Sequence, residues 1–186
     1  MTELINDNTS NHPSKYASAI RYGLIAGFIL TFLTTINFLY MLKVGYIPFM
    51  VMGFIMFIVP VVFYIIAAQK QKKLNGGVLS MKDAFQTIFI VILISSLISS
   101  IYGILYNAFI DPEGVNRMKE AMVAYFESLN MPDSKIDEVI SNVDKATQSA
   151  KSASKMLMGF AQGIIFQSIL GFIVALIIKK DYKTNA

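Results

Sequence analysis

The sequence contains no cysteine and a single histidine. The lack of cysteine excludes disulfide bonds, iron–sulfur clusters, thiolate zinc sites and nucleophilic thiols. The histidine, His12, lies beside Pro13 in a polar stretch, so neither a metal site nor a serine triad can be assembled around it. We therefore expect no catalytic residue, no metal site and no cofactor.

Charge is also scarce, since only 15% of the 186 residues are charged and 55% are hydrophobic. A water-soluble chain with this ratio could not cover its apolar surface, so the expected solvent is lipid. The formal net charge is +4, but most cations flank apolar stretches, where lipid headgroups would lie. Nucleic acid is therefore not expected as a partner, whereas membrane lipid is.

Four apolar stretches are long enough to cross a membrane as helices. About 20 uncharged residues at a rise of 1.5 Å span the hydrocarbon layer. The predicted transmembrane helices cover residues 22–42, 47–68, 84–110 and 156–178. The fold class is therefore all-α, an integral membrane four-helix bundle, with residues 15–186 as one membrane domain and residues 1–14 as a disordered tail.

Local signals place the helix ends. Asn75-Gly76-Gly77 should end the second helix, and Ser80 with Asp83 has the spacing of a capping box that starts the third. The triplet Asp111-Pro112-Glu113 should end the third helix, and Asp111 should cap the helix that follows.

The segment 111–155 is not apolar enough to span a membrane but has helical periodicity. Apolar residues recur every three or four positions in two runs, which are separated by a break at residues 130–132. This pattern predicts a helical hairpin between the third and fourth transmembrane helices. The second run contains no proline or glycine before Gly159, so residues 134–178 could form one continuous rod of roughly 65 Å.

Positive charge in the short loops predicts the orientation. In a four-span arrangement one side receives nine basic residues: Lys15, Arg21, Lys70, Lys72, Lys73, Lys82, Lys179, Lys180 and Lys183. That side, with both termini, is expected in the cytoplasm, and the membrane is expected to be the bacterial inner membrane. The segment 111–155, with six basic and eight acidic residues, is then extracytoplasmic.

Polar residues inside the spans are the first candidate site. They are four amides that we expect to be buried and four serines on the third helix: Asn37, Asn107, Gln162, Gln167, Ser95, Ser96, Ser99 and Ser100. They would either pack helices together by hydrogen bonds or line a polar path, and packing is the favoured interpretation. The spacings Gly23/Gly27 and Gly159/Gly163 also favour close helix packing, within one chain or between two copies.

The apolar face of the predicted hairpin is the second candidate site. It includes Met118, Met122, Phe126, Ile136, Ile140 and Val143. Such a face must be covered by the other helix of the hairpin, by lipid headgroups or by a partner.

The stretch from Gly76 to Phe85, Gly-Gly-Val-Leu-Ser-Met-Lys-Asp-Ala-Phe, and the later run from Asn107 to Pro112, Asn-Ala-Phe-Ile-Asp-Pro, resemble a known bacterial family, domain of unknown function 4199. The resemblance covers residues 16–180. Members of that family are uncharacterised envelope proteins. The resemblance therefore implies a four-span topology with a helical insert before the last span, and it implies no activity, cofactor or catalytic residue.

Two functions remain open from the sequence. The first is a non-enzymatic envelope scaffold or accessory subunit that engages lipid, an envelope protein or a second copy of itself through the outer hairpin. The second is a small transporter or channel component whose polar path is lined by the serines of the third helix. Intramembrane chemistry would need paired acids, histidines or a serine–lysine dyad, and the spans supply none of these.

Overall fold

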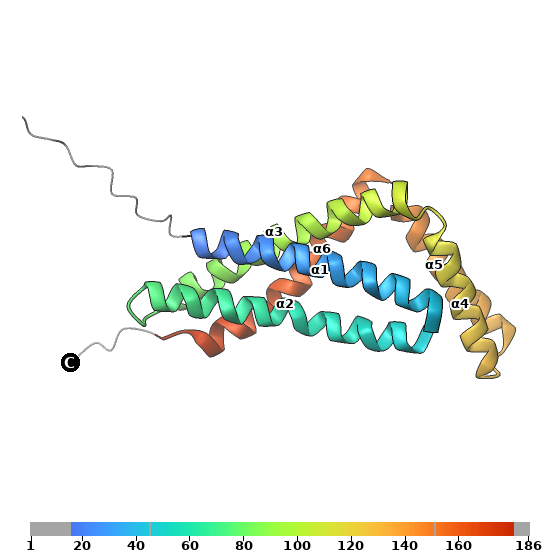
Figure 1. Cartoon of the computed structure of the whole chain (residues 1–186), viewed down its shortest axis with the longest axis horizontal. Coiled ribbons are helices and arrows are strands. Elements are labelled where there is room, and N and C mark those ends of the chain that lie inside the picture. The colour runs from blue at the N-terminus through green and yellow to red at the C-terminus, as the bar shows by residue number, and fades with distance from the viewer. Residues whose placement is uncertain (1–15, 45, 151, 181–186) are drawn as a thin grey trace, which may run out of the picture.

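The computed structural model describes residues 16–44, 46–150 and 152–180, and every regular element in these ranges is helical. The predicted tail and His12 lie outside the described residues. In chain order the elements are α1 (Ala17–Val44), α2 (Tyr46–Leu74), α3 (Met81–Leu105), the π-helical turn η1 (Tyr106–Ile110), α4 (Gly114–Ser128), α5 (Asp133–Ala150) and α6 (Ala153–Ile178) (Figure 1).

Four of these helical segments are long and apolar enough to cross a membrane. The candidate spans are Ala17–Leu39, Met50–Leu74, Met81–Ile110 and Ser154–Ile178. Their outward faces carry large apolar side chains, among which Phe28, Phe32 and Phe54 are more than 60% exposed, as a lipid-facing surface requires. The all-α class and the four predicted transmembrane helices are confirmed, and the chain is a multi-pass membrane protein.

The spanning helices pack around α3, which contacts α1, α2 and α6. Helix α1 approaches α3 closely at Gly23 and Gly27. A Cβ atom added at Gly23 would lie 2.9 Å from Cβ of Ile94, and one added at Gly27 would lie 2.7 Å from Cδ1 of Ile98. The predicted packing role of this glycine pair is therefore confirmed, and the contact lies within one chain.

The buried core continues this use of small residues. Lipid tails are as apolar as the side chains, so helices in a membrane associate through close packing rather than through the hydrophobic effect. Nine of the thirteen buried residues of the described core cluster are alanines or β-branched residues of α3: Ala19, Ala26, Ala67, Ala68, Ala84, Ala175, Ile88, Val91 and Ile92. These residues fill the bundle toward one of its ends.

At that end lie the start of α1, the α2–α3 connection and the end of α6 (Figure 1). The described basic residues of these segments gather there, and we call this the basic end: Arg21, Lys70, Lys72, Lys73, Lys82, Lys179 and Lys180. The sequence prediction that these cations share one side of the membrane agrees with this arrangement.

Backbone hydrogen bonds tie the basic end together. Leu79 and Lys180 exchange two N–H···O bonds, each of 2.9 Å, so the residues after α6 pair with the α2–α3 connection. The Lys72 ammonium group donates to the carbonyl of Ile178 at 2.7 Å, and thereby satisfies a carbonyl at the end of α6 that has no partner within the helix.

The predicted ends of α2 and α3 are confirmed. Gly76 and Gly77 have φ of 69° and 87°, a conformation that glycine adopts without a steric cost. The hydroxyl of Ser80 accepts a 3.1 Å hydrogen bond from the backbone N–H of Asp83 and donates to its carboxylate at 2.8 Å. The capping box read from the sequence therefore starts α3.

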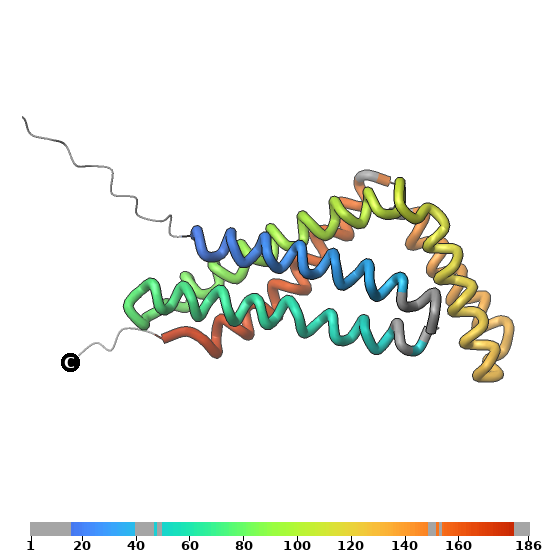
Figure 2. The backbone as a smooth tube through the Cα atoms, viewed as in Figure 1, coloured from blue at the N-terminus to red at the C-terminus, as the bar shows by residue number. Residues whose placement is uncertain are grey.

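The predicted rod over residues 134–178 is wrong. Helix α5 ends at Ala150 and α6 begins at Ala153, with Ser152 in an extended conformation at φ −92° and ψ 124°. The two helices run in different directions (Figure 2). The break allows α5 to lie beside α4 and cover its apolar face, which a straight continuation of α6 would leave exposed.

The predicted cap at Asp111 is also wrong. The residue at the cap position of α4 is Glu113, without a capping bond from its side chain, and the carboxylate of Asp111 pairs with Arg117 instead. The turn before it departs from the α-helix as well, because the N–H of Asp111 reaches back to the carbonyl of Tyr106 at 2.8 Å. This π-helical turn adds one residue to the helical repeat.

Helices α4 and α5 lie side by side beyond the ends of α1 and α2 (Figure 1). Both run at a steep angle to the axes of α1 and α2. We call them the hairpin. The connection between them turns at Asn130, whose φ is 54°, a left-handed conformation that asparagine tolerates. The hairpin is not independent of the bundle, because α4 contacts α2 and α5 contacts α6.

Candidate functional site

A groove opens between α2 and α6 at the middle of the bundle. It has a volume of about 330 Å³, which is at the lower end of the range for small-molecule sites. Its lining residues come from all four spanning helices: Leu30, Thr34, Met56, Phe57, Pro60, Val61, Tyr64, Ser99, Gly163, Phe166, Gln167 and Leu170. Val61 and Phe166 lie at the middle of their candidate spans, so the groove faces the hydrocarbon interior of the membrane.

A chain of hydrogen bonds lies at the inner side of this groove. The hydroxyl of Tyr64 donates to Oε1 of Gln167 at 2.6 Å, and Nε2 of Gln167 donates to the hydroxyl of Ser96 at 3.1 Å. The chain joins α2, α6 and α3. Polar groups at this depth cannot bond to water, so they must find partners inside the protein.

A hydrogen bond and an aromatic contact connect α2 to α6 at the groove. One is the Tyr64–Gln167 hydrogen bond, and the other is an edge-to-face contact between Phe57 and Phe166, whose ring centroids are 6.5 Å apart. Gly163 contributes no side chain, and a Cβ atom at this position would meet nothing within 4 Å. The open volume therefore results from a missing side chain between two connected helices.

The Tyr64→Phe substitution is expected to lower the stability of the bundle by about 1 kcal/mol, because Gln167 then loses a donor within the membrane interior. For a chain of this length that corresponds to a fall of about 2–4 °C in the midpoint of thermal unfolding in detergent micelles. The control is Gln162→Leu, which removes an exposed amide of α6. If Tyr64→Phe and Gln162→Leu unfold at the same temperature, the Tyr64–Gln167 hydrogen bond contributes nothing to stability.

The eight predicted polar residues do not come together as one path. Ser96, Ser99 and Gln167 lie at the groove. Ser95 is buried and donates to the carbonyls of its own helix, and Ser100 is half-buried. The structure therefore divides the serine stripe between helix packing and one local site.

The side-chain amides within the spans differ in burial, although the sequence predicts that all of them are buried. Asn37 is 5% exposed, and its Oδ1 has no hydrogen-bond partner within the described part of the chain. The sequence also predicts burial of Asn107 and Gln162, and this is wrong because both are exposed. Nδ2 of Asn107 donates a 2.8 Å hydrogen bond to the carbonyl of Gly103, one turn earlier in the chain. The side-chain amide therefore has a partner without a second helix.

The six predicted residues of the hairpin's apolar face lie mostly between α4 and α5. Met122 and Ile136 are 7% and 5% exposed, and the other four, Met118, Phe126, Ile140 and Val143, are half-buried. An ion pair of 2.6 Å between Lys119 and Asp144 joins the same two helices. The apolar face therefore packs on itself, and the outer face of the hairpin is polar.

A second polar cluster lies where the bundle meets the hairpin. Asp111, whose side chain is 10% exposed, pairs with Arg117 one turn into α4, and this pairing raises the pKa of Arg117 above its usual range. Gly114 lies between this carboxylate and the ring of Phe38, since an added Cβ atom would be 2.8 Å from Oδ2 of Asp111 and 2.9 Å from Cε1 of Phe38. The cluster fixes the start of α4 on α1.

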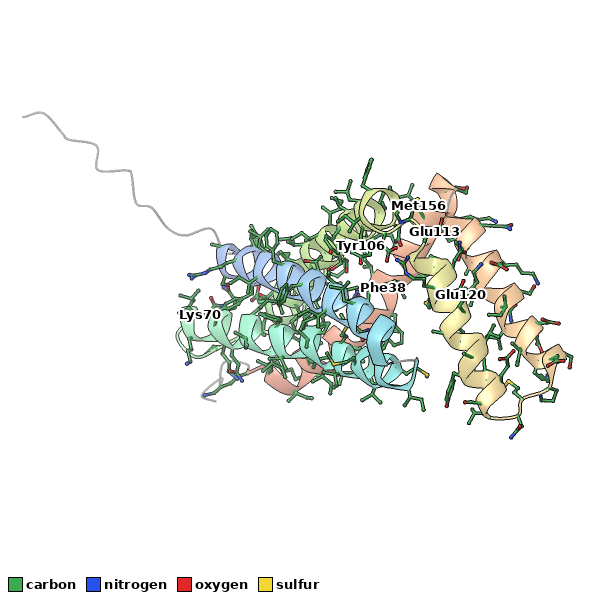
Figure 3. The ribbon with its side chains drawn as sticks, turned by 45° about the vertical axis from the view of Figure 1, so that its right-hand side comes forward. Phe38, Lys70, Tyr106, Glu113, Glu120 and Met156 are labelled. Carbon is green, nitrogen blue, oxygen red and sulfur yellow. The ribbon has the colours of Figure 1, made fainter. Side chains whose placement is uncertain are left out.

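Aromatic contacts extend the same junction into the membrane. The rings of Phe38 and Tyr106 meet edge to face with centroids 6.0 Å apart (Figure 3), and Tyr106 also contacts Tyr102. The hydroxyl of Tyr102 is hydrogen-bonded to Thr35. A tyrosine within a span needs such a partner, and this signal in the sequence could have identified both Tyr64 and Tyr102 as site residues.

Comparisons with known proteins give a family and no function. The model of the family described as "Protein of unknown function (DUF4199)" matches residues 21–180. No curated protein and no solved structure matches the chain.

Proposed function

Because the chain belongs to this family, DUF4199, whose description states no function, we propose its role from the geometry: a non-enzymatic membrane scaffold or accessory subunit. Its hairpin presents a surface to another envelope protein. The proposal places the protein in the bacterial inner membrane with the basic end in the cytoplasm, as the distribution of positive charge favours.

The observation that carries this proposal is the fixed position of the hairpin. Asp111 and Arg117 hold the start of α4, α4 rests on α2, and α5 rests on α6. Since the apolar residues are turned inward, the outer face needs no refolding before a partner binds. Such preorganisation lowers the entropic cost of association.

The exposed face of the hairpin is rich in acid. Its exposed carboxylates are Glu113, Glu120, Glu127, Asp133, Asp137 and Glu138. Anionic headgroups would be repelled by this face, whereas a partner protein with a basic patch would be attracted and oriented by it. We therefore favour a protein over lipid as the ligand of the hairpin.

The second candidate, a transporter or channel component, has one observation in its favour, the polar groups at the groove. These groups bond to one another, as in the Tyr64–Gln167 pair, and the core toward the basic end is closed by residues such as Ala68, Ala84 and Ile88. A path for water or ions would need polar groups along the whole bundle. The geometry thus supports the scaffold better.

The proposal is tested by photocrosslinking in the native membrane. A photoreactive amino acid placed at Glu120 on α4 (Figure 3) or at Asp137 on α5 is expected to capture one protein of defined size. The same amino acid at Ile101, an exposed position of the α3 span, should capture only lipid. If the hairpin positions also yield only lipid, the proposed role of the hairpin is wrong.

A charge reversal makes the test specific. The double variant Asp133→Lys and Asp137→Lys should abolish capture from position 120, because the partner is attracted by negative charge. The variant Lys135→Gln, which removes a positive charge from the same face, should leave capture unchanged or strengthen it. Capture that is insensitive to both would contradict an electrostatic interface.

A further inference from the structure

We propose that the groove between α2 and α6 binds one acyl chain of an anionic phospholipid, whose headgroup is held by the lysines of the basic end. This site is separate from the hairpin and does not depend on the function proposed for it. Its ligand comes from the leaflet of the bilayer that meets the basic end.

The walls of the groove determine what can enter. They are formed mainly by aliphatic and aromatic side chains, with Phe57 and Phe166 connecting the two helices. The hydroxyl of Thr34 donates to the carbonyl of Leu30, and Tyr64 donates to Gln167. Because these donors are already used, a hydrocarbon chain fits the groove better than a polar ligand does.

The membrane supplies that hydrocarbon chain. Protein interiors and bilayers do not keep open spaces of this size, because the atoms lining a void lose their dispersion contacts. The groove lies at the centre of the spans of α2 and α6, where the surrounding solvent consists of acyl chains.

The charge of the basic end indicates the headgroup. Lys72 of α2, which is half-buried, bonds to the carbonyl of Ile178, and the exposed Lys179 and Lys180 follow directly on α6. The contact between these two helices therefore ends beside two exposed cations. From Gln167 to Lys179 a helix rises about 18 Å, close to the thickness of one leaflet, about 15 Å. A lipid whose phosphate lies at Lys179 therefore reaches the groove with the end of its chain.

The glycines of α6 provide a matched pair of variants. Gly159 and Gly163 lie one turn apart and both face open space, but only Gly163 lines the groove. Gly163→Leu fills the groove, whereas Gly159→Leu adds the same side chain outside it. The pair also separates this proposal from a dimer seam, which both substitutions would disturb.

The experiment uses the full chain in vesicles of phosphatidylcholine that contain a trace of photoactivatable phosphatidylglycerol with a diazirine near the end of one chain. We expect labelling to concentrate on residues 56–64 and 163–170, as mapped by mass spectrometry. Gly163→Leu should reduce this labelling to that of the other exposed apolar surfaces, and Gly159→Leu should leave it unchanged. Labelling spread evenly over the lipid-facing surface, or insensitive to Gly163→Leu, would overturn the proposal.

The headgroup is tested independently of the groove. The double variant Lys179→Gln and Lys180→Gln should weaken the preference for phosphatidylglycerol over phosphatidylcholine with the same chain by roughly fivefold for each lysine removed. Equal labelling by the two lipids in the unmodified protein would overturn the assignment of an anionic lipid. Crosslinks between two copies at residues 163–170 would instead identify the occupant as a second chain and overturn the proposal.

Discussion

The Gly27→Leu variant is expected to unfold at a temperature about 6–12 °C below that of the unmodified protein. A Cβ atom at this position would lie 2.7–2.9 Å from the side chain of Ile98, on a helix that itself packs against α2 and α6. Ile98 cannot yield without moving α3, so the cost is at the upper end of the overpacking range, about 3 kcal/mol. For this chain length each kcal/mol lowers the midpoint by about 2–4 °C.

The measurement is thermal unfolding in detergent micelles, followed by circular dichroism. The matched control is Gly103→Leu, since Gly103 lies on α3 with nothing within 4 Å of an added Cβ atom. Both variants gain the same side chain on a membrane helix, and only one of them should lose stability. If Gly27→Leu unfolds at the same temperature as Gly103→Leu, α1 and α3 do not make close contact at Gly27.

The second large effect is expected at the junction of the bundle and the hairpin. Arg117→Gln removes the cation that pairs with Asp111, whose carboxylate is largely buried and is then left without a counter-charge. Breaking one partner of such a pair costs far more than the pair itself contributes. We expect α4 to detach from α1 and α2, so that the amides of residues 114–122 lose most of their protection against hydrogen exchange while those of α3 retain it.

The control for this prediction is Lys135→Gln, which breaks an ion pair with Glu138 between two well-exposed side chains. Such surface pairs contribute little, so the exchange pattern should not change. Equal loss of protection across the bundle and the hairpin in Arg117→Gln would contradict the prediction, because it would mean that the two parts unfold together.

The properties that the sequence predicts correctly are local ones. The four spans follow from the length and hydropathy of single stretches, and the start of α3 follows from Ser80 and Asp83 three residues apart. The glycines that end α2 need no distant partner either. Each of these signals is contained within one helix or one turn.

The features that the sequence does not predict depend on which helix lies opposite. Gly23/Gly27 and Gly159/Gly163 have the same spacing, yet only the first pair meets another helix. Asp111 could cap α4 or pair with Arg117, and the packing of α4 on α1 decides between them. The break at Ser152 likewise follows from the position of α5 beside α4, because no proline or glycine precedes it in α5.

The candidate site was predicted only in part for the same reason. The polarity of Ser96, Ser99 and Gln167 within a span predicts them as site residues. The groove at which they lie is also lined by Tyr64 and by Gly163, which has no side chain. A missing side chain leaves no signal in a sequence until the neighbouring helix is placed.

The paired backbone of Leu79 and Lys180 determines how the bundle can move. It joins the α2–α3 connection to the end of α6, and the bond from Lys72 to Ile178 adds a second link at the same place. The Tyr64–Gln167 hydrogen bond and the Phe57–Phe166 contact join α2 and α6 again at the groove. Helix α6 is therefore held to α2 at its end and at its middle, so displacement of α6 relative to α2 should be largest at its start, where α5 leads into it.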